Sequence, residues 1–329
     1  MKNLSIGKLR GLQQIATAGG VMTMVALDHR GSLARMISPE HPEEVSYAQM
    51  VECKLELCDQ LAPYASAVLL DPVFGVAPGI SHGVLPNNTG LLVSLEASGY
   101  GDPQYRVTEQ LKEWSVEKIK RVGASAVKLL LYYRPDLVEL AEKQRDMVKD
   151  VAQECIKYDI PFLVEPVTYP IATEVTSPEL LADTKSKLVI QTAQEITALP
   201  IDVLKAEFPG DLRYHEESEL EKRCYQIDRY SAAPWVILSA GVDYQTFYRQ
   251  VEIACKSGAS GFLAGRAIWQ EAVRMKEAQE RKEFLSTVVV DRLKRLAELA
   301  VKYASPWYRK WRLNPQELVP VSEDWYKEY

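Results

Sequence analysis

Short, almost entirely apolar segments recur along the chain, and longer segments with helical periodicity separate most of them. Eight such apolar segments can be distinguished: Val21–Leu27, Ser66–Leu70, Gly90–Leu95, Ala124–Leu131, Pro161–Val164, Ile201–Pro209, Trp235–Leu238 and Gly261–Ala264. Continuous apolar runs, in contrast to alternating ones, are typical of parallel strands that are covered by other elements. The pattern therefore predicts eight buried parallel strands.

The segments between these strands predict mostly helical crossovers. Apolar residues at helical spacing predict four long helices: Pro42–Leu61, Thr108–Val122, Pro135–Lys157 and Pro178–Leu199. Ser177 suits the N-cap of the last helix, and Pro178 suits its first turn. Val73–Thr89 is rich in glycine and proline, so we expect an irregular connection there.

This order of elements predicts an α/β fold in which residues 1–329 form one domain, a single (β/α)8 TIM barrel. An amphipathic N-terminal helix over residues 1–20 precedes the first strand and ends at two glycines. A C-terminal extension over residues 305–329 is aromatic and charged, so we expect it to pack on the barrel or on a partner subunit.

Composition narrows the classes of function. The net charge of −6 over 329 residues argues against a nucleic-acid or membrane-surface partner. No apolar run approaches the length of a membrane span, and the N-terminus lacks the apolar core of a signal peptide. The five cysteines form no C-x-x-C pair, so we expect free thiols and a cytoplasmic location. The four histidines are scattered, so we expect no metal site.

Polar and charged residues gather near the ends of the predicted strands, where a TIM barrel carries its active site. They are Asp28, Asp71, Glu96, Lys128, Glu165, Lys205, Ser239 and Arg266. This concentration indicates an enzyme.

Lys205 lies on the sixth predicted strand, two residues before Glu207. Burial deprives an ammonium group of hydration and favours the neutral amine, which can form a Schiff base with a carbonyl group. Lys128 on the fourth strand would favour the neutral amine further through like-charge repulsion, and Glu165 could transfer protons. The alternative is that these residues form structural ion pairs, with Lys205 bound to Glu207 or to another carboxylate.

Two glycine turns, SAGV at 239–242 and AGR at 264–266, follow the last two strands. A TIM barrel commonly binds phosphate at these loops, through backbone N–H groups beside glycine. We therefore expect an anion site at Ser239, Gly241, Gly265 and Arg266, although glycines that only form tight turns would give the same pattern.

The motifs together resemble the class I tagatose-1,6-bisphosphate aldolases of lactose and galactose catabolism. The resemblance covers most of the chain and rests on LDHRGS (27–32), AVKLLLYY (126–133), FLVEP (162–166), DVLKAEFP (202–209), ILSAGV (237–242) and FLAGRAIW (262–269). It implies that Lys205 forms the Schiff base, that Glu165 is the acid and base, that Lys128 positions both, and that Asp28 contacts sugar hydroxyls. It also implies a sugar-phosphate substrate, a homo-oligomer and no metal or other cofactor.

His29 departs from the resemblance, because the tagatose aldolases usually have glutamine at this position. Sulfofructose-phosphate aldolases resemble the chain at the lysine and at the proximal phosphate, so cleavage of sulfofructose 1-phosphate is an alternative. Arg30 and Arg134 are the candidates for binding the distal anion. A sugar-phosphate sensor without turnover is a further alternative, against which the set Lys128, Glu165 and Lys205 speaks.

Overall fold

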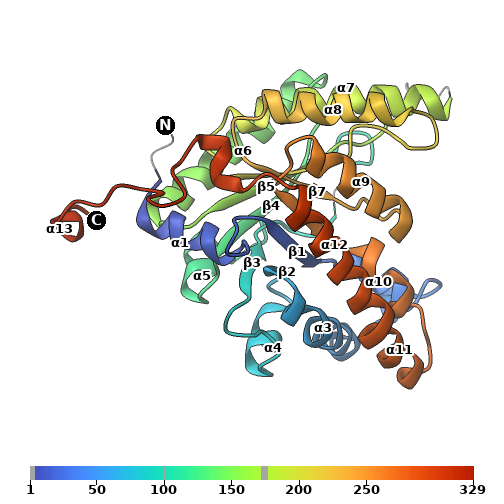
Figure 1. Ribbon diagram of the computed structural model, residues 1–329. Coiled ribbons are helices and arrows are strands. Elements are labelled where there is room, and N and C mark those ends of the chain that lie inside the picture. The colour runs from blue at the N-terminus through green and yellow to red at the C-terminus, as the bar shows by residue number, and fades with distance from the viewer. Residues whose placement is uncertain (1–3, 100, 172–176) are drawn as a thin grey trace.

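A computed structural model describes residues 4–99, 101–171 and 177–329 of the chain. Eight parallel strands close into a barrel in sequence order, with β1 hydrogen-bonded to both β2 and β8 (Figure 1). The strands are β1 (Met22–Leu27), β2 (Ala67–Leu70), β3 (Gly90–Ser94), β4 (Ala126–Tyr132), β5 (Phe162–Val167), β6 (Val203–Ala206), β7 (Trp235–Leu238) and β8 (Gly261–Ala264). This confirms the predicted barrel.

Helices connect the strands and cover the outside of the barrel (Figure 1). The α-helices are α1 (Ile6–Gln14), α2 (Gly31–Ile37), α3 (Tyr47–Leu61), α4 (Val76–Ser81), α5 (Val116–Arg121), α6 (Val138–Lys157), α7 (Pro178–Thr197), α8 (Glu217–Tyr230), α9 (Tyr244–Lys256), α10 (Arg266–Val273), α11 (Ala278–Phe284), α12 (Val290–Tyr303) and α13 (Trp325–Glu328). Short 3-10 turns are η1 (Pro42–Glu44), η2 (Ala62–Tyr64) and η5 (Trp307–Trp311), and η4 (Leu285–Val289) is π-helical.

Three predicted helices are shorter than expected. The helix expected from Pro42 begins only at Tyr47, because Ser46 and Gln49 form a reciprocal capping box there. In place of a helix over Thr108–Val122, only α5 forms, and the preceding segment places Gln110 in a bridge with Glu96. The N-terminal helix covers Ile6–Gln14 rather than residues 1–20, of which residues 1–3 lie outside the described part.

The chain termini pack at the end of the barrel where the strands begin. Lys8 of α1 forms a buried ion pair of 2.7 Å with Asp202, directly before β6. In the C-terminal extension, Trp307 and Trp311 are buried, and the Trp311 indole donates to the Ala232 carbonyl oxygen at 3.0 Å. The opposite end, where the strands finish, is therefore left open. Among the described residues, none of the helices is long and apolar enough to span a bilayer.

Candidate active site

A cavity of about 530 Å³ occupies the end of the barrel where the strands finish. Among the described residues that line it, six side chains are basic and four are acidic, although the whole chain carries a net charge of −6. The basic residues are Arg30, Arg35, Lys128, Lys185, Lys205 and Arg266, and the acidic residues are Asp28, Glu96, Glu165 and Glu207. A positive cavity in an acidic protein favours an anionic ligand.

Five charged residues, each on or just after a different strand, form one hydrogen-bonded cluster at the floor of this cavity. The ammonium group of Lys128 lies 2.7 Å from Asp28, 2.6 Å from Glu96 and 3.0 Å from Glu165. Glu165 uses its other oxygen, Oε1, to bind Lys205 Nζ at 2.7 Å. The two lysines therefore share one carboxylate. All four predicted catalytic residues meet here, together with Glu96.

The charges of the cluster determine its protonation. Burial alone would raise the pKa of Asp28 and of Glu165, but the ammonium groups of Lys128 and Lys205 outweigh it and lower both pKa values. For Lys128, burial opposes the charge, but Asp28, Glu165 and Glu96 together raise its pKa well above the usual value. Lys128 is thus a permanent cation, and Asp28 and Glu165 are carboxylates at neutral pH.

Of the two carboxylate partners that the sequence left open for Lys205, Glu207 or another carboxylate, the structure shows the second, Glu165. Glu207 instead binds the ammonium group of Lys185 at 2.8 Å through Oε1. Its Oε2 accepts hydrogen bonds of 2.7 Å from both the backbone N–H and the hydroxyl group of Thr168. Lys205 and Glu207 line the same cavity, as their spacing predicts, but they belong to different ion pairs.

The predicted phosphate turns flank the cluster. Ser239 is buried, and the next residues, Ala240 and Gly241, have left-handed φ angles of 47° and 78°. A side chain at Gly241 would lie only 3.0 Å from the guanidinium carbon of Arg266, so this turn and Arg266 are in close contact. A left-handed alanine is strained, and such strain concentrates at binding sites.

A second arginine, Arg35, also lines the cavity. Burial lowers the pKa of Arg266, the carboxylates of Glu165 and Asp28 oppose this, and the charge of Arg35 adds to it. In the part of the chain that the structure describes, neither arginine forms an ion pair with a carboxylate. An anion between Arg35, Arg266 and the turn would relieve their repulsion.

Of the two arginines proposed for the distal anion, only Arg30 lies in the cavity. Its guanidinium donates to the Glu96 carbonyl oxygen at 2.7 Å. Arg134 is 2% exposed and is not among the residues that line the cavity, so its binding of the distal anion stays a prediction. Arg134 binds Asp136 at 2.6 Å and the Tyr169 carbonyl oxygen at 2.7 Å. Its role is to hold the loop after β4.

Residues 22–271 match the family model described as DeoC/LacD family aldolase. The chain belongs to this aldolase family. It is 34% identical to the tagatose 1,6-diphosphate aldolase of Lactococcus lactis subsp. lactis, over 92% of this chain and 98% of the relative. Identity to the enzyme of the same name from Staphylococcus aureus strain JH9 is 30%, again over 92% of this chain and 98% of the relative.

Solved aldolases share the fold. A Schiff-base-forming fructose-1,6-bisphosphate aldolase superposes with a TM-score of 0.60 at 19% identity, over 88% of this chain and 98% of that one. The fructose-bisphosphate aldolase of Plasmodium falciparum gives a TM-score of 0.67 at 13% identity, over 92% and 98% of the two chains. The family and the fold agree, and the protein is an aldolase, which is a lyase.

His29 follows Asp28 and lines the same cavity. Burial lowers its pKa to about 3, despite the nearby carboxylate of Asp28, so the ring is neutral. The ring packs edge-on against Trp269 at 5.1 Å and leaves no room for a side chain at Gly265, where a Cβ would lie 2.8 Å from it. His29 thus lies between the charged cluster and the phosphate turn.

Asp71, another strand-end residue, lies outside the cavity. It forms a buried ion pair of 2.6 Å with Lys54 of α3 and accepts hydrogen bonds from the backbone N–H groups of Val73 and Phe74. A charged residue after a strand can therefore stabilise the loop rather than serve the site.

Sequence reasoning missed Arg35 and Lys185 as cavity residues. Both belong to helices, α2 and α7, rather than to strand ends, so no strand-based signal identifies them. Glu96 was recognised as a strand-end residue, but its contact with Lys128 depends on the pairing of β3 with β4, which brings Ser94 beside Lys128.

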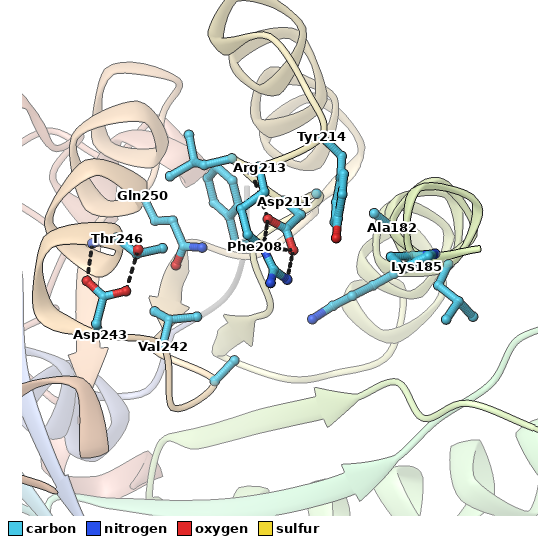
Figure 2. A pocket seen from close by; sticks show the side chains of 15 residues that line it. Ala182, Lys185, Phe208, Asp211, Arg213, Tyr214, Val242, Asp243, Thr246 and Gln250 are labelled. Atoms are coloured by element: carbon cyan, nitrogen blue, oxygen red, sulfur yellow. Dashed lines mark hydrogen bonds and ion pairs between the residues drawn. The ribbon is translucent and has the colours of Figure 1, made fainter. Parts of the chain in front are cut away.

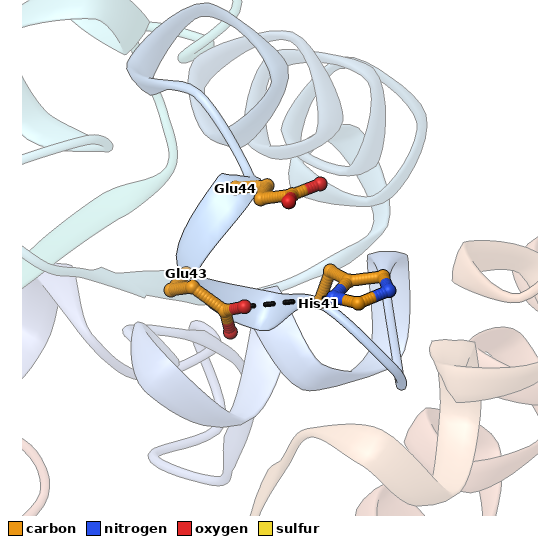
Figure 3. Close-up of side chains that lie close together, drawn as sticks. All are labelled: His41, Glu43 and Glu44. Atoms are coloured by element: carbon orange, nitrogen blue, oxygen red, sulfur yellow. Dashed lines mark ion pairs between the residues drawn. The ribbon is translucent and has the colours of Figure 1, made fainter.

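Among the described residues, one group of side chains has the spacing of a metal site: His41, Glu43 and Glu44 (Figure 3). All three are exposed and lie at η1, and none of them lines the cavity of the aldolase. Exposed acidic groups of this kind are common without an ion.

A second cavity of about 550 Å³ adjoins the first (Figure 2). It lies between α7, the loop after β6 and the N-terminal part of α9, and its walls include Leu181, Phe208 and Tyr214. Lys185 and Ala240 line both cavities, so they mark the boundary between them.

Proposed function

We propose that this aldolase cleaves D-tagatose 1,6-bisphosphate to dihydroxyacetone phosphate and glyceraldehyde 3-phosphate through a Schiff base on Lys205. The observation that carries the proposal is the shared carboxylate: Glu165 lies 2.7 Å from Lys205 and 3.0 Å from Lys128 at the floor of a positive cavity. The name of the relatives from Lactococcus and Staphylococcus supports the substrate, and it favours tagatose bisphosphate over sulfofructose 1-phosphate.

Glu165 can activate Lys205 by direct proton transfer. Its carboxylate takes a proton from the ammonium group across 2.7 Å, which leaves a neutral amine and a protonated acid. The amine attacks C2 of the open-chain ketose and forms a carbinolamine. Glu165 then returns the proton to the carbinolamine hydroxyl group, water leaves, and an iminium cation forms on Lys205.

The iminium accepts the electrons of the breaking bond. A base removes the proton from the C4 hydroxyl group, the C3–C4 bond breaks, and glyceraldehyde 3-phosphate leaves. The electron pair of the C3–C4 bond stays on C3 and forms an enamine on Lys205. Glu165, again a carboxylate after the first stage, is the candidate base. Protonation of the enamine at C3 and addition of water to the resulting iminium release dihydroxyacetone phosphate and restore the amine.

The other residues bind and position. Lys128 fixes Asp28, Glu96 and Glu165 at one point, so that Glu165 faces Lys205 and Asp28 can contact the sugar hydroxyl groups. Ser239, Gly241, Gly265 and Arg266 would bind the phosphate on C1, one bond from the ketone carbon. Arg35 would add a second guanidinium group to that phosphate.

Borohydride trapping tests this proposal. Incubation with tagatose 1,6-bisphosphate and borohydride should give a stable adduct on Lys205, found by mass spectrometry of peptides, and cleavage should survive a chelator. Lys205→Ala should lose both the adduct and turnover, while Lys187→Ala, at an exposed lysine of α7, should keep both. Cleavage that continues with Lys205 unlabelled would overturn the Schiff base, and binding without cleavage would favour the sensor.

A further inference from the structure

We propose that Lys185 binds the distal anion of the substrate, that is, the phosphate or sulfonate at the far end of the ketose. This inference rests on the proposed function, because it assumes that C2 of the ketose is attached to Lys205. In this proposal Lys185 takes the role first expected of Arg134, which is not among the residues that line the cavity. Lys185 and Arg30 would then bind the distal anion together.

The position of Lys185 is fixed by a buried carboxylate. Glu207 is only 5% exposed and is held by two hydrogen bonds from Thr168, and it binds the Lys185 ammonium group at 2.8 Å. The lysine side chain extends from α7 toward the loop after β6, at the boundary of the two cavities (Figure 2). It is 35% exposed, so its ammonium group is accessible to a ligand in the cavity.

The spacing along β6 fits the length of the substrate. Glu207 follows Lys205 by two residues on the same side of the chain, a step of about 7 Å toward the open end of the barrel. From C2, which bonds to Lys205, a ketohexose extends four carbon–carbon bonds of about 1.5 Å to C6. Lys185 and Lys205 line the same cavity, so the ammonium group held at Glu207, farther along the chain than Lys205, is available to the far end of the sugar.

The distribution of charge supports a separate distal site. Arg266 lies against the turn after β7, while Lys128 and Lys205 are paired within the carboxylate cluster. Among the cations that line the cavity, Arg30 and Lys185 are the two that remain for a second anion. The ammonium group of Lys185 has three hydrogen-bond donors, and Glu207 does not use all of them. Donors therefore remain for a ligand.

The test compares substrates with and without the distal anion. Lys185→Met and the control Lys187→Met, at an exposed lysine of the same helix, would be assayed with tagatose 1,6-bisphosphate, tagatose 1-phosphate and sulfofructose 1-phosphate. We expect Lys185→Met to raise KM for the bisphosphate by about 10- to 100-fold, the usual effect of one charge-assisted hydrogen bond. KM for tagatose 1-phosphate should change less than about twofold, and Lys185→Arg should recover much of the loss.

The substrates also separate the sources of the anion. An increase in KM for the sulfonate but not for the bisphosphate would assign the site to sulfonate, and an increase for both would assign it to either anion. Equal losses on all three substrates, or no loss on any, would overturn the proposal and leave Lys185 as a structural ion pair. Failure of the wild-type enzyme to cleave any of the three would instead contradict the proposed function.

Discussion

Lys128 is the residue on which the geometry of the site depends. It is 1% exposed and touches three carboxylates, those of Asp28, Glu96 and Glu165, so it holds them within a few ångströms of one another. A buried ion cluster contributes little net stability, because each charge loses its hydration. The cluster instead fixes the position of Glu165, which has one carboxylate oxygen on Lys128 and the other on Lys205.

His29 should make the protein sensitive to acid. In the folded state its pKa is about 3, whereas in the unfolded chain it has the ordinary value of 6.5. Below pH 6.5 the unfolded state therefore binds a proton that the folded state does not bind. As the pH falls below 6.5, the free energy of unfolding decreases. At pH 5 the loss from this one group should be about 2 kcal/mol.

The variant His29→Gln should remove this loss. Urea unfolding at pH 7, 6 and 5 should show the free energy of unfolding of the wild type falling relative to that of the variant. His41→Gln, at an exposed histidine, is the control and should follow the wild type. Parallel curves for wild type and His29→Gln would mean that His29 is not held neutral by burial.

At the residue scale, the sequence predicted the residues that lie at strand ends and missed those that reach the cavity from helices. Asp28, Lys128, Glu165 and Lys205 were found because barrel topology brings strand ends together. Arg134 also follows a strand, but Asp136, two residues later, captures its guanidinium group within the same loop. A nearby carboxylate of this kind is a local signal that the prediction did not use.

At the scale of elements, the turn after β7 determines where Arg266 lies. Gly241 has a φ of 78°, and a Cβ there would lie 3.0 Å from the Arg266 guanidinium carbon. Glycine thus permits both the left-handed backbone and the close approach of the arginine. Helix α10 begins at Arg266, so this contact joins the turn after β7 to the turn after β8.

Gly241→Ala should displace Arg266 and weaken phosphate binding. We expect KM for phosphorylated ketoses to rise about 10-fold, the effect of weakening one charged hydrogen bond. Gly123→Ala is the matched control, since Gly123 has a φ of 82° and a Cβ added there would meet no atom within 4 Å. Both variants should lose about 1 kcal/mol of stability from backbone strain. An equal KM in the two variants would show that the contact with Arg266 does not matter.

Boundaries of elements were predicted less well than their order. The strands follow from short apolar runs, and their order is preserved even where a boundary is missed, as at the end of β6, which ends at Ala206 and not at Pro209. The start of α3 depends instead on the capping box between Ser46 and Gln49, and the short α5 starts where Ser115 accepts a hydrogen bond from Lys118. A helix begins at its N-cap even where helix-forming residues precede that cap. For this reason the predicted helix starts at Pro42 and Thr108 were wrong.

At the scale of the whole molecule, the two ends of the barrel have different tasks. The open end holds the charged cavity, and the other end is covered by α1 (Figure 1). Lys8 of α1 binds Asp202, and the same carboxylate oxygen accepts a hydrogen bond of 2.9 Å from the Phe162 N–H, at the start of β5. Asp202 is fully buried, so this contact joins α1, β5 and β6 at one charged point.

Lys8→Met should therefore destabilise the protein without changing its catalysis. Removal of one partner leaves the buried carboxylate of Asp202 without its cation, which costs about 3–5 kcal/mol in comparable pairs. Arg10→Met, at an exposed position of the same helix, should change the free energy of unfolding by less than about 0.5 kcal/mol. Urea unfolding measures the stabilities, and kcat and KM measured well below the unfolding transition should match the wild type for both variants. If Lys8→Met altered KM as strongly as it altered stability, the closed end of the barrel would be coupled to the active site, and the division of tasks between the two ends would be wrong.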